Sequence, residues 1–88
     1  MNLNNLIDEA KRNAGSLGSL AKELGKSQSR ISEWKAGTRK PDASEIAFLA
    51  ERAGRSVLAT VAEIEAELNP RYAILWKNAV RAMAQNQG

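Results

Sequence analysis

Apolar residues recur along the chain at intervals of three and four positions, in six segments that are separated by glycine or proline. This spacing places the apolar side chains of each segment on one face of a helix. No stretch alternates apolar and polar residues for long enough to predict a strand. The pattern therefore predicts an all-α fold built from five or six short helices.

The first three helices are predicted from their apolar stripes and from the residues that end them. Helices are expected over residues 3–14, 17–24 and 28–36, and each is followed by a glycine that can stop it: Gly15, Gly25 and Gly37. Ser27 can cap the third helix, because its hydroxyl can accept from a backbone N–H of the first turn. Ile31 and Trp34 are the apolar contacts of this helix, and we expect Trp34 to lie in the core.

The second half of the chain predicts three more helices. Asp42 and Glu45 form a capping-box pattern at the start of a fourth helix, which Gly54 ends. Ser56 opens a fifth, whose Glu63 and Glu67 are expected on its solvated side. A sixth helix is predicted to start with an N-cap and a first-turn proline at residues 69–70, and the polar residues 85–88 are expected to fray.

Composition excludes most chemistry. The chain has 88 residues, enough for one domain, and it contains no cysteine and no histidine. Disulfides, thiolate chemistry, the usual zinc sites and every histidine-based catalytic arrangement are therefore excluded. We expect no enzymatic activity, no cofactor and no metal.

Two further features bear on location. The longest apolar run, Ile46–Ala50, is far shorter than the ~20 residues that a membrane span needs. The first ten residues lack the apolar core of an export signal. We therefore expect a cytoplasmic location and no membrane association.

The net charge of +3 is unevenly distributed along the chain. Residues 1–41 carry eight basic and four acidic side chains, for +4, whereas residues 42–88 carry five and six, for −1. Within residues 22–40 there are six basic and two acidic side chains. Such a segment favours a polyanion as partner, although a charge cluster is also typical of a solvated surface.

Residues 17–41, LGSLAKELGKSQSRISEWKAGTRKP, contain two short predicted helices joined by a tight turn. Ala21 is small where the two helix backbones approach, and Gly25 permits the positive φ that such a turn requires. With Ile31 and Trp34 buried, the opposite face of the second helix carries small or polar side chains: Gln28, Ser29, Ser32, Glu33 and Ala36. This face suits entry into a major groove about 12 Å wide.

The motif ISEWKAGTRKP after a SLAKELG helix resembles the phage repressor and Cro-like helix-turn-helix family, of the xenobiotic-response-element-like class. The resemblance covers residues 17–54. It implies a five-helix DNA-binding domain, here residues 1–68, and leaves residues 69–88 as an additional C-terminal helix. It also implies a transcriptional regulator of double-stranded DNA, a repressor of phage or mobile-element origin. One departure is Leu17, where family members often have a phosphate-contacting Gln; Ser16 or Ser19 could supply that contact, or it could be missing.

The resemblance implies which residues contact DNA. Base contacts are expected from four residues of the third helix: Gln28, Ser29, Ser32 and Glu33. Gln28 could pair with adenine, and Glu33 could accept from a cytosine amine. Phosphate contacts are expected from flanking polar and basic residues: Lys26, Ser27, Arg30, Lys35, Thr38, Arg39 and Lys40. Two alternatives are a surface pair between Glu33 and Arg30, and a Lys35 that is only solvated.

The apolar stripe of the sixth helix has two interpretations. The resemblance implies a homodimer on a pseudo-palindromic operator, with half-sites about one helical turn, roughly 34 Å, apart. We expect the fifth and sixth helices to form its interface through six residues: Tyr72, Leu75, Trp76, Ala79, Val80 and Met83. The alternative is a helix that completes the core of a monomer. A second functional hypothesis is an antitoxin, in which the same stripe binds a partner protein.

Overall fold

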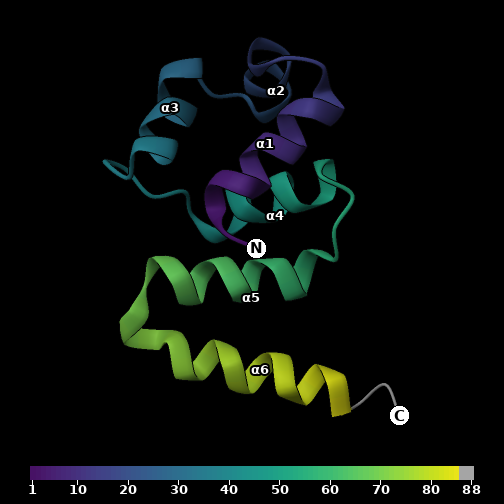
Figure 1. Ribbon diagram of the computed structural model, residues 1–88, viewed down its shortest axis with the longest axis vertical. Helices are drawn as coiled ribbons and strands as arrows, with labels where there is room; N and C mark the ends of the chain where they lie inside the picture. The colour runs from purple at the N-terminus through teal and green to yellow at the C-terminus, as the bar shows by residue number, and fades with distance from the viewer. Residues whose placement is uncertain (86–88) are drawn as a thin grey trace.

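The described part of the chain consists of helices and short connections. The computed structural model describes residues 1–85, and within them the predicted all-α fold is confirmed, without any strand (Figure 1). The elements are α1 (Leu3–Ala14), α2 (Leu17–Leu24), α3 (Gln28–Ala36), α4 (Ala43–Arg52), α5 (Val57–Leu68), the 3₁₀ turn η1 (Pro70–Tyr72) and α6 (Ala73–Gln85). Of residues 85–88, which are predicted to fray, Gln85 is the last residue of α6 and residues 86–88 lie outside the described residues.

Side-chain hydrogen bonds mark where four of the helices begin. The residues before α1, α2, α3 and α4 each accept from a backbone N–H three positions on: Asn2, Ser16, Ser27 and Asp42. The predicted capping box at α4 is present, since Asp42 N–H donates to Glu45 Oε1 and Glu45 N–H donates to Asp42 Oδ1, both at 2.8 Å. Each cap satisfies a donor that the helix itself leaves unpaired.

One hydrophobic core is shared by the first five helices. Its largest fully buried side chains come from α1 to α5: Leu6, Ile7, Leu20, Ile31, Trp34, Ile46, Leu49 and Ile64. α1 packs against α2, α3 and α4, and so it joins the pair α2 and α3 to α4. The predicted core position of Trp34 is confirmed, because only 2% of its surface is exposed.

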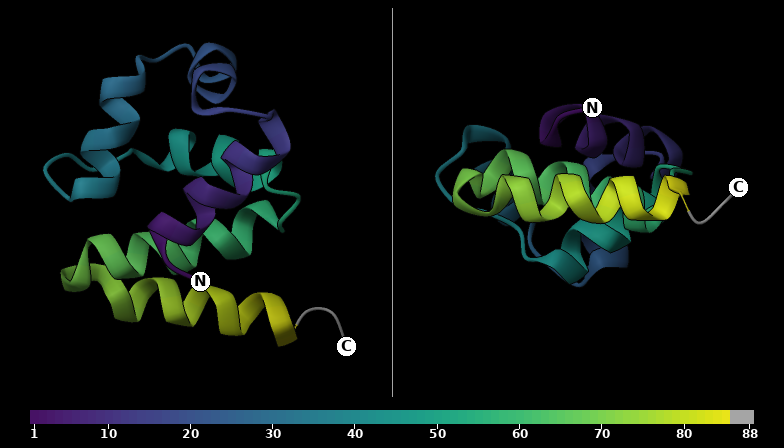
Figure 2. Two further views of the ribbon diagram at one scale, coloured as in Figure 1. Left: turned by 45° about the horizontal axis from the view of Figure 1, so that its top comes forward. Right: turned by 90° about the horizontal axis from the view of Figure 1, so that it is seen from below.

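α6 lies outside this core. It runs antiparallel beside α5, at the opposite end of the molecule from α2 and α3 (Figures 1 and 2). The longest dimension of the molecule is 40 Å, and residues 73–84 of α6 contribute no fully buried side chain. α6 therefore adds a further layer to a core that α1 to α5 already close. No helix within these residues is long and apolar enough to cross a membrane.

The joint before α6 agrees with its prediction only in part. The chain enters the short turn η1 at Pro70, and α6 begins only at Ala73. Asn69 makes no side-chain cap to this segment; its amide instead donates to Glu65 Oε2 at 3.2 Å. Asn69 and Pro70 thus hold the predicted N-cap and first-turn positions of the C-terminal helical segment, but its first turn is 3₁₀ and the side chain of Asn69 bonds back to α5 instead of capping it.

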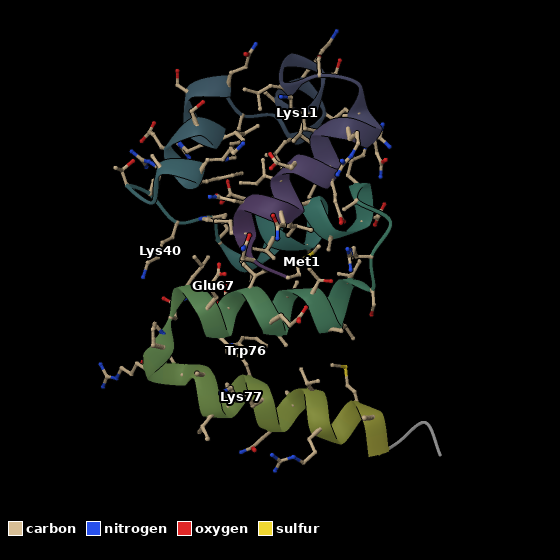
Figure 3. All side chains as sticks on the ribbon, viewed as in Figure 1. Met1, Lys11, Lys40, Glu67, Trp76 and Lys77 are labelled. Atoms are coloured by element: carbon tan, nitrogen blue, oxygen red, sulfur yellow. The ribbon has the colours of Figure 1, made fainter. Side chains whose placement is uncertain are left out.

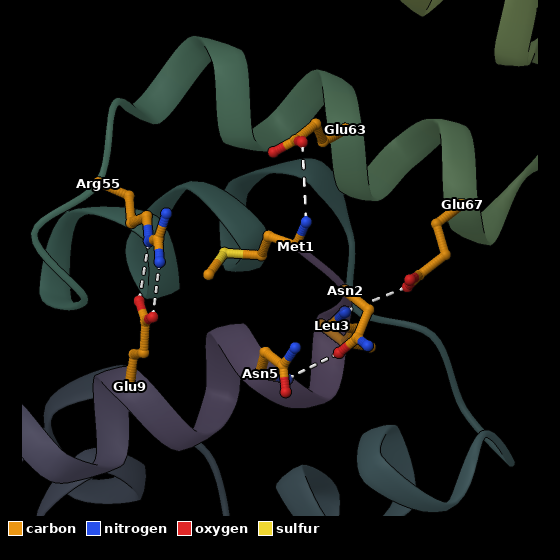
Figure 4. A network of polar contacts seen from close by, with 8 residues as sticks. All are labelled: Met1, Asn2, Leu3, Asn5, Glu9, Arg55, Glu63 and Glu67. Carbon is orange, nitrogen blue, oxygen red and sulfur yellow. Dashed lines mark hydrogen bonds and ion pairs between the residues drawn. The ribbon is translucent and has the colours of Figure 1, made fainter.

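The acidic side of α5 is exposed, as predicted, and two of its glutamates also contact the start of the chain. Leu3 N–H, at the start of α1, donates to Glu67 Oε2 at 3.2 Å, and the N-terminal ammonium lies 3.8 Å from Glu63 Oε1 (Figure 4). Glu63 and Glu67 are thus exposed but not merely solvated. Glu67 accepts from a backbone N–H that α1 leaves unpaired. Its negative charge also stabilises the N-terminus of α1, where the helix dipole is positive.

Two ion pairs join α1 to elements distant in the sequence. The Lys35 ammonium donates to Asp8 Oδ1 at 2.8 Å, and Arg55 donates to both carboxylate oxygens of Glu9, at 2.6 and 2.8 Å (Figure 4). The hydrogen bond from Lys35 lowers the pKa of Asp8, and the one from Arg55 lowers the pKa of Glu9. Both carboxyls therefore bind protons less readily in the folded state than in the unfolded state.

We predict that the stability contributed by these pairs is present above about pH 4, near the ordinary carboxyl pKa, and is lost as the pH falls through the lowered pKa values. The double variant D8N/E9Q should start less stable near pH 6 and lose less stability on acidification. Urea unfolding across this pH range measures the effect. An identical pH dependence for parent and variant would contradict the assignment.

Candidate nucleic-acid interface

The turn between α2 and α3 fixes the angle between these helices. Gly25 has φ 75°, in the left-handed region, where a side chain would be strained. The backbone N–H groups of Gly25 and Lys26 donate to the carbonyls of Lys22 and Ala21, at 3.2 and 3.0 Å, and so end α2. No atom lies within 4 Å of the position that a Gly25 Cβ would take, so the requirement for glycine is conformational and not steric.

α3 is oriented by its two buried side chains. Ile31 is fully buried and Trp34 nearly so, and together they face the core. The opposite face of α3 is accordingly exposed, with Gln28, Ser29 and Ser32 in solvent. The structure therefore places these three sequence-predicted base contacts together on one accessible surface at the end of the molecule remote from α6 (Figure 1).

The side chain of Gln28 reaches across to the start of α2. A Cβ added to Gly18 would lie 3.2 Å from Gln28 Nε2 and 3.8 Å from Ser16 Oγ. Gly18 thus leaves the space that the Gln28 amide occupies, a role that the sequence reasoning missed. The available signal was a glycine inside a short helix, which costs about 1 kcal/mol relative to alanine and usually has a packing reason.

The two serines proposed to replace the family's phosphate-contacting Gln lie close together. Ser16 Oγ accepts from Ser19 N–H at 3.0 Å as the cap of α2, and its hydroxyl lies 3.1 Å from Ser19 Oγ. Both side chains are exposed at the N-terminus of α2. This helix end presents backbone N–H groups and a positive dipole, which favour an anion.

Four of the predicted phosphate-contacting cations have partners within the protein. Lys26 Nζ lies 3.6 Å from Glu45 Oε2, and the pairs of Lys35 with Asp8 and of Arg39 with Glu33 have distances of 2.8 and 3.1 Å. Lys40 Nζ donates to the carbonyl of Leu68 at 2.7 Å. Arg30, half-buried, has no such ion pair within residues 1–85. The cations therefore occupy defined positions at both ends of α3.

Two sequence interpretations change as a result. The alternative of a surface pair between Glu33 and Arg30 was wrong, because Glu33 pairs with Arg39 of the following loop. The alternative of a merely solvated Lys35 was also wrong, because its ammonium is bonded to Asp8 of α1. Arg39 comes close to Glu33 because the loop after α3 turns back toward the helix. Asp8 comes close to Lys35 because α1 packs against α3.

Lys40 has a role that the sequence did not predict. It lies in the loop between α3 and α4, and its ammonium caps the last carbonyl of α5 (Figure 3). A cation at a helix C-terminus stabilises it by about 0.3–1 kcal/mol. The loop that follows α3 is thereby attached to the joint from which the C-terminal segment departs.

The hydroxyls on either side of α3 form hydrogen bonds with the backbone at the two ends of the helix. Ser27 Oγ accepts from Arg30 N–H at 3.1 Å, and Thr38 Oγ1 donates to the carbonyl of Glu33 at 3.3 Å. Gly37, with φ 80°, carries the chain out of the helix between them. Ser27 keeps its own proton available for a further acceptor.

The six residues predicted for a dimer interface form one apolar stripe along η1 and α6, and they differ in how far they are buried. Trp76, Val80 and Met83 are half-buried, whereas Tyr72, Leu75 and Ala79 are exposed. Between α5 and α6 runs a shallow groove of about 270 Å³, and Trp76 points into the space between the helices (Figure 3). It is lined by Ala62, Glu63, Ala66, Trp76, Lys77 and Val80. Within residues 1–85, no cluster of three acidic, histidine or cysteine side chains could hold a metal ion.

Two short helices joined by a left-handed glycine, the second with an exposed polar face between cationic segments, define a helix-turn-helix protein. Residues 12–59 match the helix-turn-helix family of the Cro-like, xenobiotic-response-element-like type, and this is more than half of the chain. The chain therefore belongs to this family of sequence-specific DNA-binding domains, as the motif in residues 17–41 predicts. The matched range ends within α5 and leaves α6 outside it. No curated protein and no solved structure shows a match to the chain.

Proposed function

We propose that this DNA-binding chain is a cytoplasmic transcriptional repressor that acts as a homodimer on a pseudo-palindromic operator. The observation that carries the proposal is the exposed face of α3, where Gln28, Ser29 and Ser32 lie together between two groups of cations. Occupying the operator would block transcription. A phage or mobile-element origin, suggested by the resemblance to repressors of that kind, is part of the same proposal.

In this proposal α3 enters the major groove and the segments on either side of it contact the backbone. Gln28 would read adenine through its amide, because a glutamine can pair bidentately with that base. Lys26, Ser27 and Arg30 would contact phosphates at the start of α3, and Thr38, Arg39 and Lys40 at its end. Glu33 would reach a cytosine amine only after leaving Arg39, and Lys35 would reach phosphate only after leaving Asp8.

Selection of bound sequences from a random DNA library tests the proposal, since it reports DNA binding, half-site symmetry and half-site spacing together. On the selected duplex, Gln28→Ala should lose about 1–3 kcal/mol of discrimination at one base pair of each half-site. Arg39→Ala is the contrasting variant, because loss of a phosphate contact should weaken binding to all sequences about equally. Fluorescence anisotropy with the selected duplex and its single-base variants measures both. If the two variants behave alike, the division into base and phosphate contacts is wrong.

The charges of α5 and α6 support a second copy of the chain as the partner of the groove. α5 carries three glutamates and no basic residue, whereas α6 carries Lys77 and Arg81 and no acidic residue. Glu63 and Lys77 line the groove together, beside the apolar side chains of Trp76 and Val80. A copy placed with its α6 over the partner's α5 would bring each lysine to the other copy's glutamate. Such opposed charges favour one orientation of the two copies and disfavour others.

Charge exchange tests this interface. Sedimentation without DNA should find the parent dimeric, and Lys77→Glu or Glu63→Lys should each weaken the dimer, because like charges then meet. The double variant E63K/K77E should restore it. Circular dichroism controls for folding, particularly for Glu63→Lys, which also loses its contact with the N-terminal ammonium. Single exchanges that leave the dimer unchanged would rule out this face as the interface.

A protein partner is the second candidate for the C-terminal segment, as in the antitoxin hypothesis. The specific observation is that three large apolar side chains at the start of this segment are exposed by more than half: Tyr72, Ile74 and Leu75. Exposed apolar side chains that gather in one region commonly mark protein contacts. A parent chain that sediments as a monomer at every concentration would favour this candidate over the homodimer.

A further inference from the structure

The carboxylate of Glu45 has two contacts that belong to different parts of the interface. One oxygen, Oε1, accepts from Asp42 N–H at 2.8 Å and completes the capping box of α4. The other, Oε2, lies 3.6 Å from Lys26 Nζ, in the turn just before α3. Glu45 therefore connects the segment that precedes α3 with the segment that follows it.

Glu45 differs from the other carboxylates that face the cations around α3. Its side chain is only 13% exposed, whereas those of Asp8 and Glu33 are 50% and 42% exposed. The capping hydrogen bond fixes the carboxylate, so it cannot turn away when another anion approaches. Asp8 and Glu33 lack such a hydrogen bond from the backbone within residues 1–85 and can release their cations more freely.

A fixed carboxylate restricts where Lys26 can place its charge. A lysine has a long, flexible side chain that in free solution could reach phosphates in many orientations of the protein on DNA. Paired with Glu45, the ammonium lies at the start of α4, while the backbone of Lys26 stands in the turn just before α3. It can then meet a phosphate with full effect only when α3 itself is seated in the groove.

We propose that Glu45 is a specificity-determining positioning residue, which holds Lys26 for the specific complex and limits its use in non-specific ones. This inference rests on the proposed binding of DNA through α3. Non-specific binding depends almost entirely on contacts between cations and phosphates, so a restriction on one cation weakens it directly. The specific complex keeps its base contacts and uses Lys26 in the position that Glu45 already provides.

The test is Glu45→Gln, which keeps an oxygen for the capping hydrogen bond and removes the charge. Affinity for a random-sequence duplex at low salt should rise roughly three- to fivefold, the size expected of one partly exposed ion pair. Affinity for the selected operator should change less, so that the ratio of specific to non-specific affinity falls. Glu51→Gln is the matched control, because it removes the same charge from an exposed position on α4 that has no ion pair within residues 1–85. The control should leave the ratio unchanged.

A double-variant cycle with Lys26→Gln separates positioning from a general effect of charge. In the Lys26→Gln background, Glu45→Gln should no longer change the ratio, because the side chain that it positions is gone. Lys26→Gln alone leaves the α4 cap intact and should lower specific affinity more than non-specific affinity. It keeps the proposal testable if Glu45→Gln fails to fold.

Three results would overturn the inference: an unchanged ratio in Glu45→Gln, the same change in the Lys26→Gln background, or an equal loss of both affinities in Lys26→Gln. These outcomes differ from a failure of the proposed function. If the unmodified chain binds no duplex at all, the proposed function is wrong and this inference falls with it.

Discussion

The burial of Ile31 and Trp34 is the interaction on which the interface depends. These two side chains set which face of α3 is turned to the core, and hence which face is left for a partner. The left-handed turn at Gly25 supplies the second constraint, because it fixes where α3 starts relative to α2. Core packing thus determines which face of α3 is exposed, and the turn determines where the helix starts. The exposed side chains of α3 lie side by side because they share that face.

The cations around α3 are positioned by acceptors within the protein. Lys26, Lys35 and Arg39 are each paired with a carboxylate, and Lys40 is bonded to a helix carbonyl. A phosphate that approaches one of these cations must therefore displace its acceptor or share the cation with that acceptor. Exposed pairs of this kind contribute at most about 1 kcal/mol each, so exchange is energetically feasible. In the proposed function, this arrangement would order the cations before binding and reduce their attraction for DNA in unsuitable orientations.

The sequence predicted those features that depend on neighbours along the chain. Helix starts at Ser27 and Asp42, the turn at Gly25 and the burial of Trp34 all follow from local spacing and cap chemistry. Contacts between distant segments could not be predicted, because they depend on how the helices pack. The bond from Lys40 to the end of α5, the pair of Lys35 with Asp8 and the contact of Leu3 with Glu67 are of this kind. At residues 69–70 the local pattern indicated an N-cap followed by a first-turn proline. It could not indicate that the side chain of Asn69 would bond to Glu65 instead of capping the next segment.

We propose that α3 and its flanking segments bind DNA, whereas α6 does not. Backbone amide chemical shifts of the ¹⁵N-labelled protein, titrated with the selected duplex, test it most directly. The account predicts that the largest changes fall in residues 16–19, 26–32 and 37–40, with small changes along α6. Largest changes along α6, with α3 unaffected, would contradict it.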